Sequence, residues 1–218
     1  MPKRFNLLVF DWDGTLADST QAIVDALQMA CRDIGLPVPD DSRSRSIIGL
    51  SLGEALQALF PDADADTGQQ LVERYRFHYL ARDNEIVLFD GVPHAINELI
   101  EAGFMLAIAT GKGRGGLNRA LAQTGLAGFF HASRCADECF SKPHPQMLEQ
   151  ILDELGTLPQ RSLMIGDTHY DLQMAQNAGV AGVGVSYGAQ PHESLFPYAP
   201  LACFDSFAKL HAWLNENA

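Results

Sequence analysis

The stretch that decides the fold is FNLLVFDWDGT, residues 5–15, in which an apolar run ends in two aspartates and a glycine. A run rich in Leu, Val and Phe predicts a strand that is buried on both faces, as in a parallel sheet. Gly14 lets the backbone turn away from the sheet edge. Asp11 and Asp13 repel each other unless they share a cation or a proton, so the pair predicts a metal site, a nucleophile with its acid-base partner, or both. A lone motif of this kind is also typical of a helix cap beside a turn aspartate.

Composition restricts the class of protein. The chain has 218 residues and is 47% hydrophobic, which predicts a globular fold made of one domain with a large insertion or of two small domains. Fifteen Lys and Arg residues against 27 Asp and Glu give a formal net charge of -12, which disfavours nucleic acid or an anionic membrane as the main partner. No apolar run approaches the roughly 20 residues of a membrane span. We also find no signal-type cleavage site, and therefore expect a cytoplasmic location.

The four cysteines and seven histidines give no sign of a structural metal site. Cys135 and Cys139 lie four residues apart, without the Cys-x-x-Cys pairs or histidine partners that zinc requires. The histidines form no pair at helical i, i+4 spacing. We therefore expect free thiols and ordinary surface or core histidines.

Two changes of pattern divide the chain. After Thr15, apolar residues recur at helical spacing to about Gly35, and residues 41–83 remain helical in character without a convincing strand. From Leu88 onward, helical and strand patterns alternate, which is typical of βαβ units around a parallel sheet. We therefore predict an α/β fold with a Rossmann-like core, residues 1–15 and 89–218, that carries an all-helical insertion at residues 16–88.

Two further segments place polar groups after a predicted strand or on a stiff turn. Residues 104–109 predict a buried strand that ends in Thr110-Gly111-Lys112, where a hydroxyl and backbone amides form an anion site or simply a strand-to-helix turn. Lys142 precedes Pro143 on a stiffened segment, which would aim its ammonium group, although an exposed lysine at a helix start shows the same pattern.

The last segment is again an apolar strand followed by acidic residues. Residues 163–166 lead into Asp167, and Asp171 follows four residues later. Short aspartate side chains supply the hard oxygen ligands that Mg²⁺ prefers. In a parallel sheet the carboxyl ends of the strands share one edge, so all of these segments are expected to meet in one crevice.

This ordered series resembles the haloacid dehalogenase superfamily of phosphatases and phosphomutases. The resemblance rests on Asp-x-Asp-Gly-Thr at residues 11–15, Thr110, Lys142-Pro143, and Gly166-Asp167 with Asp171, and it covers nearly the whole chain. The insertion after the first motif resembles the type-1 cap domain of that superfamily. The layout is similar to that of the phosphoglycolate phosphatases, in which a segment resembling residues 49–54 dips toward the active site.

The resemblance implies catalytic roles. Asp11 would be the nucleophile that forms an aspartyl-phosphate, and Asp13 would act first as the acid and then as the base. Thr110 and the backbone of Gly111 would hold the transferring phosphoryl group. Lys142 would balance the charge on Asp11 and on the phosphate.

The resemblance also implies a cofactor. Mg²⁺ would be bound by the side chain of Asp11, the backbone carbonyl of Asp13 and the side chain of Asp167. Asp171 would either orient these groups or contact the metal itself.

Two positions narrow the predicted reaction. Asp13 argues against haloacid dehalogenase and phosphonatase chemistry, because those relatives lack an aspartate at this position, and Thr15 favours hydrolysis over phosphomutase chemistry. We predict a Mg²⁺-dependent phosphatase that hydrolyses a small phosphomonoester similar to phosphoglycolate. A β-phosphoglucomutase-like phosphomutase or a pyrophosphatase remains an alternative enzyme. A phosphometabolite-binding protein without activity is the alternative of another class.

The predicted substrate contacts come from both parts of the chain. Besides Thr110, Gly111 and Lys142, we predict contacts from Arg43 and Ser51 of the cap. The further candidates are Arg45, Glu54, Lys112 and Arg114. The expected partner is a small phosphorylated metabolite, with no nucleic acid and no membrane, and the chain is expected to be a monomer or a homodimer.

Overall fold

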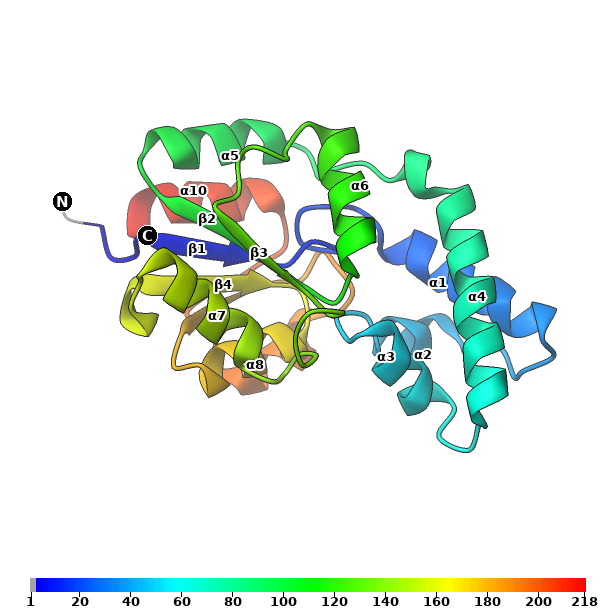
Figure 1. Ribbon diagram of the computed structural model, residues 1–218. Coiled ribbons are helices and arrows are strands. Elements are labelled where there is room, and N and C mark those ends of the chain that lie inside the picture. Colours follow the sequence, from blue (N-terminus) through cyan, green and yellow to red (C-terminus); the bar gives the residue numbers. More distant parts are fainter. Residues whose placement is uncertain (1–2) are drawn as a thin grey trace.

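The computed structural model describes residues 3–218 and contains a central sheet with helices on both faces (Figure 1). All neighbouring strands pair in parallel, in the order β3-β2-β1-β4-β5-β6. The strands are β1 (Leu7–Phe10), β2 (Met105–Thr110), β3 (Ala132–Cys135), β4 (Ser162–Gly166), β5 (Ala181–Val185) and β6 (Cys203–Phe204). The strand order reverses between β1 and β4, which in open α/β sheets is where ligands bind. The predicted α/β fold with a Rossmann-like parallel sheet is confirmed.

Strand β1 lies at the centre of the sheet because both of its faces are apolar. Leu8 and Phe10 belong to the apolar core on one face, and Leu7 and Val9 belong to the core on the other. All four side chains are fully buried. The first face is covered by α5 (Val92–Glu101), α6 (Arg114–Thr124) and α10 (Phe207–Asn217), and the second by α7 (Gln146–Leu155) and α8 (His169–Asn177) (Figure 1).

Four of the helices between β1 and β2 lie together beyond the carboxyl ends of the strands (Figure 1). We call them, with their connecting loops, the helical insertion: α1 (Thr20–Asp33), α2 (Asp41–Arg45), α3 (Leu52–Leu59) and α4 (Ala65–Ala81). They enclose an apolar cluster of their own, which includes Leu27, Leu56 and Leu71. An isolated antiparallel bridge joins Ala17 to Leu88, so the two crossings between insertion and sheet lie side by side. The predicted domain boundaries at residues 16 and 88 stay a prediction.

Short helical segments complete the described chain: η1 (Asp83–Glu85), η2 (Pro159–Arg161), α9 (His192–Leu195) and η3 (Phe196–Tyr198). Helix α6 begins at Arg114, and the extended Gly113 is its N-cap. No helix in residues 3–218 is both long and apolar enough to cross a membrane.

The central position of β1 predicts a large loss of stability when its packing is removed. Leu8→Ala deletes most of a fully buried side chain, so we expect the free energy of unfolding to fall by about 2–5 kcal/mol. Val87 is 62% exposed, and Val87→Ala should change stability by less than about 0.5 kcal/mol. Urea denaturation of the two variants measures both effects. Equal losses would contradict the assignment of β1 to the core.

Candidate active site

The predicted catalytic residues meet at the carboxyl edge of the sheet. Asp11 and Asp13 directly follow β1, Thr110 ends β2, and Asp167 directly follows β4. Lys142 lies in the segment between β3 and α7, and its ammonium nitrogen is 2.9 Å from Oδ1 of Asp11. The parallel order of the strands therefore brings residues more than 150 positions apart into one site.

Lys142 forms a buried ion pair with two aspartates. Its Nζ atom lies 2.9 Å from Oδ1 of Asp11 and 2.6 Å from Oδ1 of Asp171, and none of the three side chains is more than 2% exposed. Burial by itself would lower the pKa of Lys142, but Asp11 and Asp171 outweigh this effect and raise it, so the ammonium group stays charged. The other oxygen of Asp171 accepts hydrogen bonds from the backbone and hydroxyl of Thr168, at 3.0 and 2.7 Å. Asp171 is thus fixed at the start of α8.

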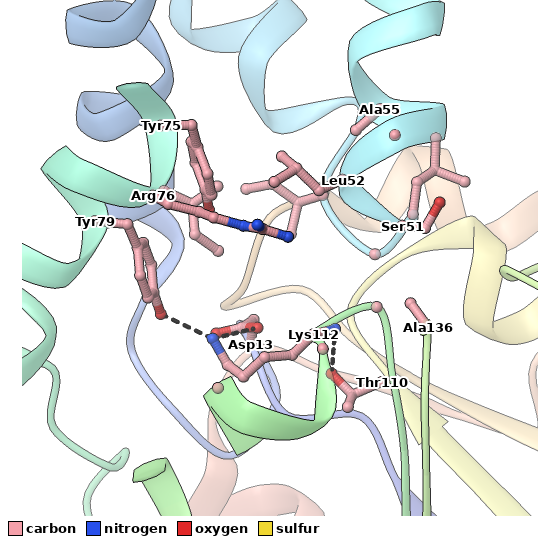
Figure 2. Close-up of a pocket in the computed structure, with 18 of the residues that line it drawn as sticks. Asp13, Ser51, Leu52, Ala55, Tyr75, Arg76, Tyr79, Thr110, Lys112 and Ala136 are labelled. Carbon is pink, nitrogen blue, oxygen red and sulfur yellow. Dashed lines mark hydrogen bonds and ion pairs between the residues drawn. The ribbon is translucent and has the colours of Figure 1, made fainter. Parts of the chain in front are cut away.

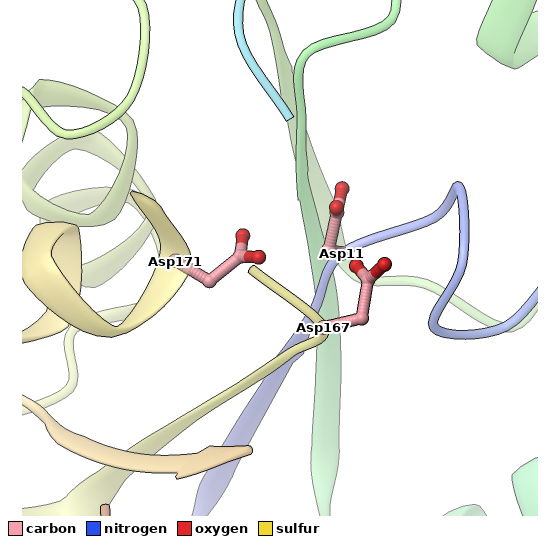
Figure 3. Close-up of side chains that lie close together, drawn as sticks. All are labelled: Asp11, Asp167 and Asp171. Carbon is pink, nitrogen blue, oxygen red and sulfur yellow. The ribbon is translucent and has the colours of Figure 1, made fainter. Parts of the chain in front are cut away.

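Three carboxylates lie close together beside this lysine. Asp11, Asp167 and Asp171 each offer an oxygen within 4.8 Å of the others (Figure 3). Burial raises the pKa of Asp11 to about 7, although the charge of Lys142 acts in the opposite direction. Burial and the charge of Asp11 also raise the pKa of Asp167 well above its ordinary value. Clustered carboxylates with such shifts are typical of a functional site.

Asp167 is held in place despite this repulsion. Thr15 Oγ1 donates a hydrogen bond to Oδ1 of Asp167 at 3.1 Å, and the backbone N–H of Ala189 donates to Oδ2 at 2.7 Å. The backbone of Gly14 passes so close that a Cβ atom there would lie 2.1 Å from Oδ2 of Asp167. The glycine of the first motif therefore also makes room for the carboxylate that follows β4.

Asp13 is bound by groups from both the sheet and the helical insertion. Ser19 Oγ donates to Oδ1 of Asp13 at 2.7 Å, and Lys112 Nζ lies 3.2 Å from Oδ2. Lys112 also donates to the hydroxyl of Tyr79 on α4 at 2.9 Å (Figure 2). The predicted acid therefore contacts the start of α1 directly through Ser19, and α4 indirectly through Lys112.

A cavity of about 530 Å³ lies between the sheet and the insertion. Asp11, Asp13, Thr110 and Gly111 line it from the sheet side. The insertion approaches these residues closely, because a Cβ atom on Gly111 would lie 2.6 Å from the carbonyl oxygen of Gly49. On the insertion side the wall is largely apolar and includes Ile23, Leu52, Ala55, Leu56 and Tyr75.

The structure brings only some of the predicted substrate contacts to this cavity. Ser51 and Lys112 line it, and the backbone N–H of Ser51 donates to Ser141 Oγ at 2.8 Å. Arg43 does not line it. Its guanidinium donates to the carbonyl of Leu59, 2.7 Å away at the end of α3, and its predicted contact with substrate stays a prediction.

The other charged candidates are also engaged elsewhere or lie outside the cavity. Arg45 donates to the side chain of Gln21 at 2.7 Å, and Arg114 pairs with Glu138 at 2.7 Å. Glu54 is exposed and is absent from the cavity lining.

Sequence reasoning did not find three residues that the structure places at the site, namely Ser19, Arg76 and Tyr79. Ser19 precedes α1 and resembles a helix cap, but its hydroxyl donates to Asp13. Tyr79 lies on the apolar face of α4. Such a position in the sequence indicates a buried side chain, but it does not show that the hydroxyl binds Lys112. Arg76 lines the cavity from the same helix.

Comparison with known proteins assigns the family. The model of the haloacid dehalogenase-like hydrolase family matches residues 8–185. The chain belongs to this family. This hydrolase is 32% identical to the probable phosphatase IndB of Dickeya dadantii, over 94% of this chain and 91% of that protein. The predicted superfamily and the predicted phosphatase class of this enzyme are confirmed.

Other relatives of this haloacid dehalogenase-like hydrolase agree with that class. It is 29% identical to the pyrophosphatase PpaX of Anoxybacillus flavithermus, over 90% of this chain and 91% of that protein. A predicted phosphatase from Clostridium acetobutylicum has a similar crystal structure, with a TM-score of 0.86 and 26% identity over 97% of this chain and 99% of that one.

The close approach of Gly14 to Asp167 predicts different effects for two glycine substitutions. Gly14 and Gly35 both have positive φ, at 78° and 74°, but a Cβ atom on Gly35 would meet nothing within 4 Å. We expect Gly35→Ala to cost about 1–2 kcal/mol of stability with unchanged activity. Gly14→Ala should also displace Asp167 and lower p-nitrophenyl phosphate hydrolysis at least about tenfold. Equal activities in the two variants would contradict the contact.

Proposed function

We propose that this enzyme is a Mg²⁺-dependent phosphatase that hydrolyses a small, phosphoglycolate-like phosphomonoester through a phosphorylated Asp11. The position of Asp11 carries the proposal. Its Oδ1 atom is anchored by Lys142 at 2.9 Å and by the backbone N–H of Trp12 at 2.7 Å, and the residue lines the cavity. Within residues 3–218 no donor reaches Oδ2, so one oxygen is fixed and the other is available to attack phosphorus.

The first step transfers the phosphoryl group to the enzyme. Oδ2 of Asp11 attacks phosphorus, and the bond between phosphorus and the ester oxygen breaks. That oxygen takes a proton from the carboxyl group of Asp13 and leaves as an alcohol. Thr110 ends β2 and Gly111 follows it, so that Thr110 Oγ1 and the backbone N–H of Gly111 would bind the phosphoryl oxygens during the transfer.

The second step releases phosphate. Water attacks the same phosphorus atom and gives a proton to the carboxylate of Asp13, while the bond from phosphorus to Asp11 breaks. Inorganic phosphate leaves, and both aspartates return to their starting protonation states. Lys142 Nζ lies beside Asp11 throughout, so the carboxylate that leaves phosphorus is stabilised by an adjacent positive charge.

The charges and donor atoms of the site fit Mg²⁺. When all three clustered carboxylates are ionised, they and the ammonium group of Lys142 leave two negative charges in a buried region, which a divalent cation would neutralise. Asp11 and Asp167, with the predicted backbone carbonyl of Asp13, would hold the ion. Asp171 is engaged by Lys142 and Thr168, so we assign it to the support of the lysine. Bound Mg²⁺ would reduce the repulsion between Asp11 and the incoming phosphate.

Pyrophosphate hydrolysis is the second candidate function, supported by the similarity to the pyrophosphatase PpaX. The same attack by Asp11 would then release phosphate as the leaving group instead of an alcohol. The expected cytoplasmic location, the small-metabolite partner and the monomeric or homodimeric state stay predictions.

The nucleophile assignment predicts that Asp11→Asn abolishes turnover and leaves the fold intact. Asparagine has nearly the same shape but is a poor nucleophile, so the rate with p-nitrophenyl phosphate should fall below about 1% of the wild-type rate. The exposed Asp18 offers the control, and Asp18→Asn should retain full activity. Circular dichroism monitors the fold. Substantial turnover by Asp11→Asn would show that another group attacks phosphorus.

The charge balance predicts a dependence on Mg²⁺ that can be measured without turnover. Mg²⁺ should raise the thermal midpoint of the wild-type protein, because it relieves repulsion among buried carboxylates, and EDTA should reverse the rise. Asp167→Asn should lose most of this response.

Ca²⁺ should inhibit hydrolysis, since its larger coordination shell disturbs the approach of Asp11 to phosphorus. Equal rates with the two ions would contradict a tight octahedral site.

A further inference from the structure

Arg76 extends from α4 into the cavity between the insertion and the sheet. Figure 2 shows its side chain crossing toward Leu52, on the opposite side of the cavity from Asp13 and Lys112. Within residues 3–218 its guanidinium group forms neither a hydrogen bond nor an ion pair. Two arginines near it in the sequence do form ion pairs. Arg74 pairs with Asp33, and Arg82 pairs with Asp25 at 2.7 Å.

The two other cations that line the cavity are already paired. Lys112 Nζ lies 3.2 Å from Oδ2 of Asp13, and Arg119 lies 3.3 Å from a carboxylate oxygen of Asp83. Of the three cations that line the cavity, Arg76 is therefore the one that pairs with no carboxylate of residues 3–218. The N–H groups of the Arg76 guanidinium are therefore all available to donate hydrogen bonds to an anion that enters the cavity.

We propose that Arg76 binds a second anionic group, a carboxylate or a phosphate, on the leaving-group side of the substrate. This inference rests on the proposed function, because the phosphoryl group at Asp11 and Thr110 directs the rest of the molecule toward the insertion. The planar guanidinium group matches either anion through two parallel hydrogen bonds. The preferred substrates are therefore small phosphomonoesters with an acidic leaving group.

The surroundings of Arg76 favour an acidic leaving group over a sugar. Leu52, Ala55, Leu56 and Leu80 contribute apolar groups to the insertion side of the cavity. A polyhydroxylated sugar would need a hydrogen-bond partner for each hydroxyl that it buries there. A small acid needs one strong partner, and the guanidinium group of the exposed Arg76 supplies it through charge-assisted hydrogen bonds.

Matched substrates test the inference directly. Phosphoglycolate and ethyl phosphate differ by the replacement of a carboxylate with a methyl group, and 3-phosphonooxypropanoate and propyl phosphate form a longer pair. We expect Arg76→Gln to lower kcat/KM for the acidic esters at least about tenfold, mainly through KM, because it removes a charge-assisted contact. The neutral esters should change less than about threefold, and Arg76→Lys should lie between.

The control variant is Arg43→Gln, which removes one positive charge from the insertion outside the cavity. It should leave the ratio of acidic to neutral ester hydrolysis unchanged, whereas a general charge effect on substrate approach would lower that ratio in both variants. Thermal midpoints of all variants, measured with Mg²⁺, show whether folding is affected.

The outcomes separate this inference from the proposed function. If Arg76→Gln lowers hydrolysis of acidic and neutral esters equally, or of neither, Arg76 does not recognise the leaving group and the inference is wrong. The same conclusion holds if the wild-type enzyme hydrolyses p-nitrophenyl phosphate but shows no preference for either acidic ester. If the wild-type enzyme with Mg²⁺ hydrolyses no phosphomonoester at all, the proposed function fails and the inference fails with it.

Discussion

The ammonium group of Lys142, buried between Asp11 and Asp171, is the interaction on which the rest of the site depends. Moving one ion from water into a protein interior costs several kcal/mol, and a buried pair recovers this only when its geometry is good. Here one lysine serves two carboxylates, at 2.9 and 2.6 Å. Because these residues come from the end of β1, the segment before α7 and the start of α8, the network fixes three separate parts of the chain relative to one another.

The same network explains how an acidic chain can act on an anionic substrate. The formal net charge of -12 repels a phosphate ester at long range. Inside the site, however, Lys142 lies beside Asp11, and Lys112 lies beside Asp13, so each of these two carboxylates has an adjacent positive charge. The remaining excess of negative charge among the carboxylates makes a divalent cation the natural further component.

The fold and the strand-end residues could be predicted because they follow from short-range rules. A strand that is apolar on both faces must lie inside a sheet, and parallel strands place Asp11, Thr110 and Asp167 at one edge. The insertion side of the site was harder to predict. Periodicity shows which residues share a face of α4, but not how that helix is rotated against the sheet. For this reason the position of Arg76 in the cavity was missed.

In the proposed mechanism, the strand ends carry out the reaction and the insertion selects the leaving group, and these two parts of the chain contact each other. The strand ends supply the buried ion pairs, which tolerate little change because each carboxylate there is fixed by several donors. The insertion reaches them through the hydroxyl of Ser19, the backbone of residues 49–51 and the side chains of residues 75–79 of α4. Under the proposed role of Arg76, substitutions on α4 would alter which leaving group is accepted without disturbing Lys142. Tyr79 is the exception, because its hydroxyl binds the lysine that contacts Asp13, so a change there would also affect this proposed acid.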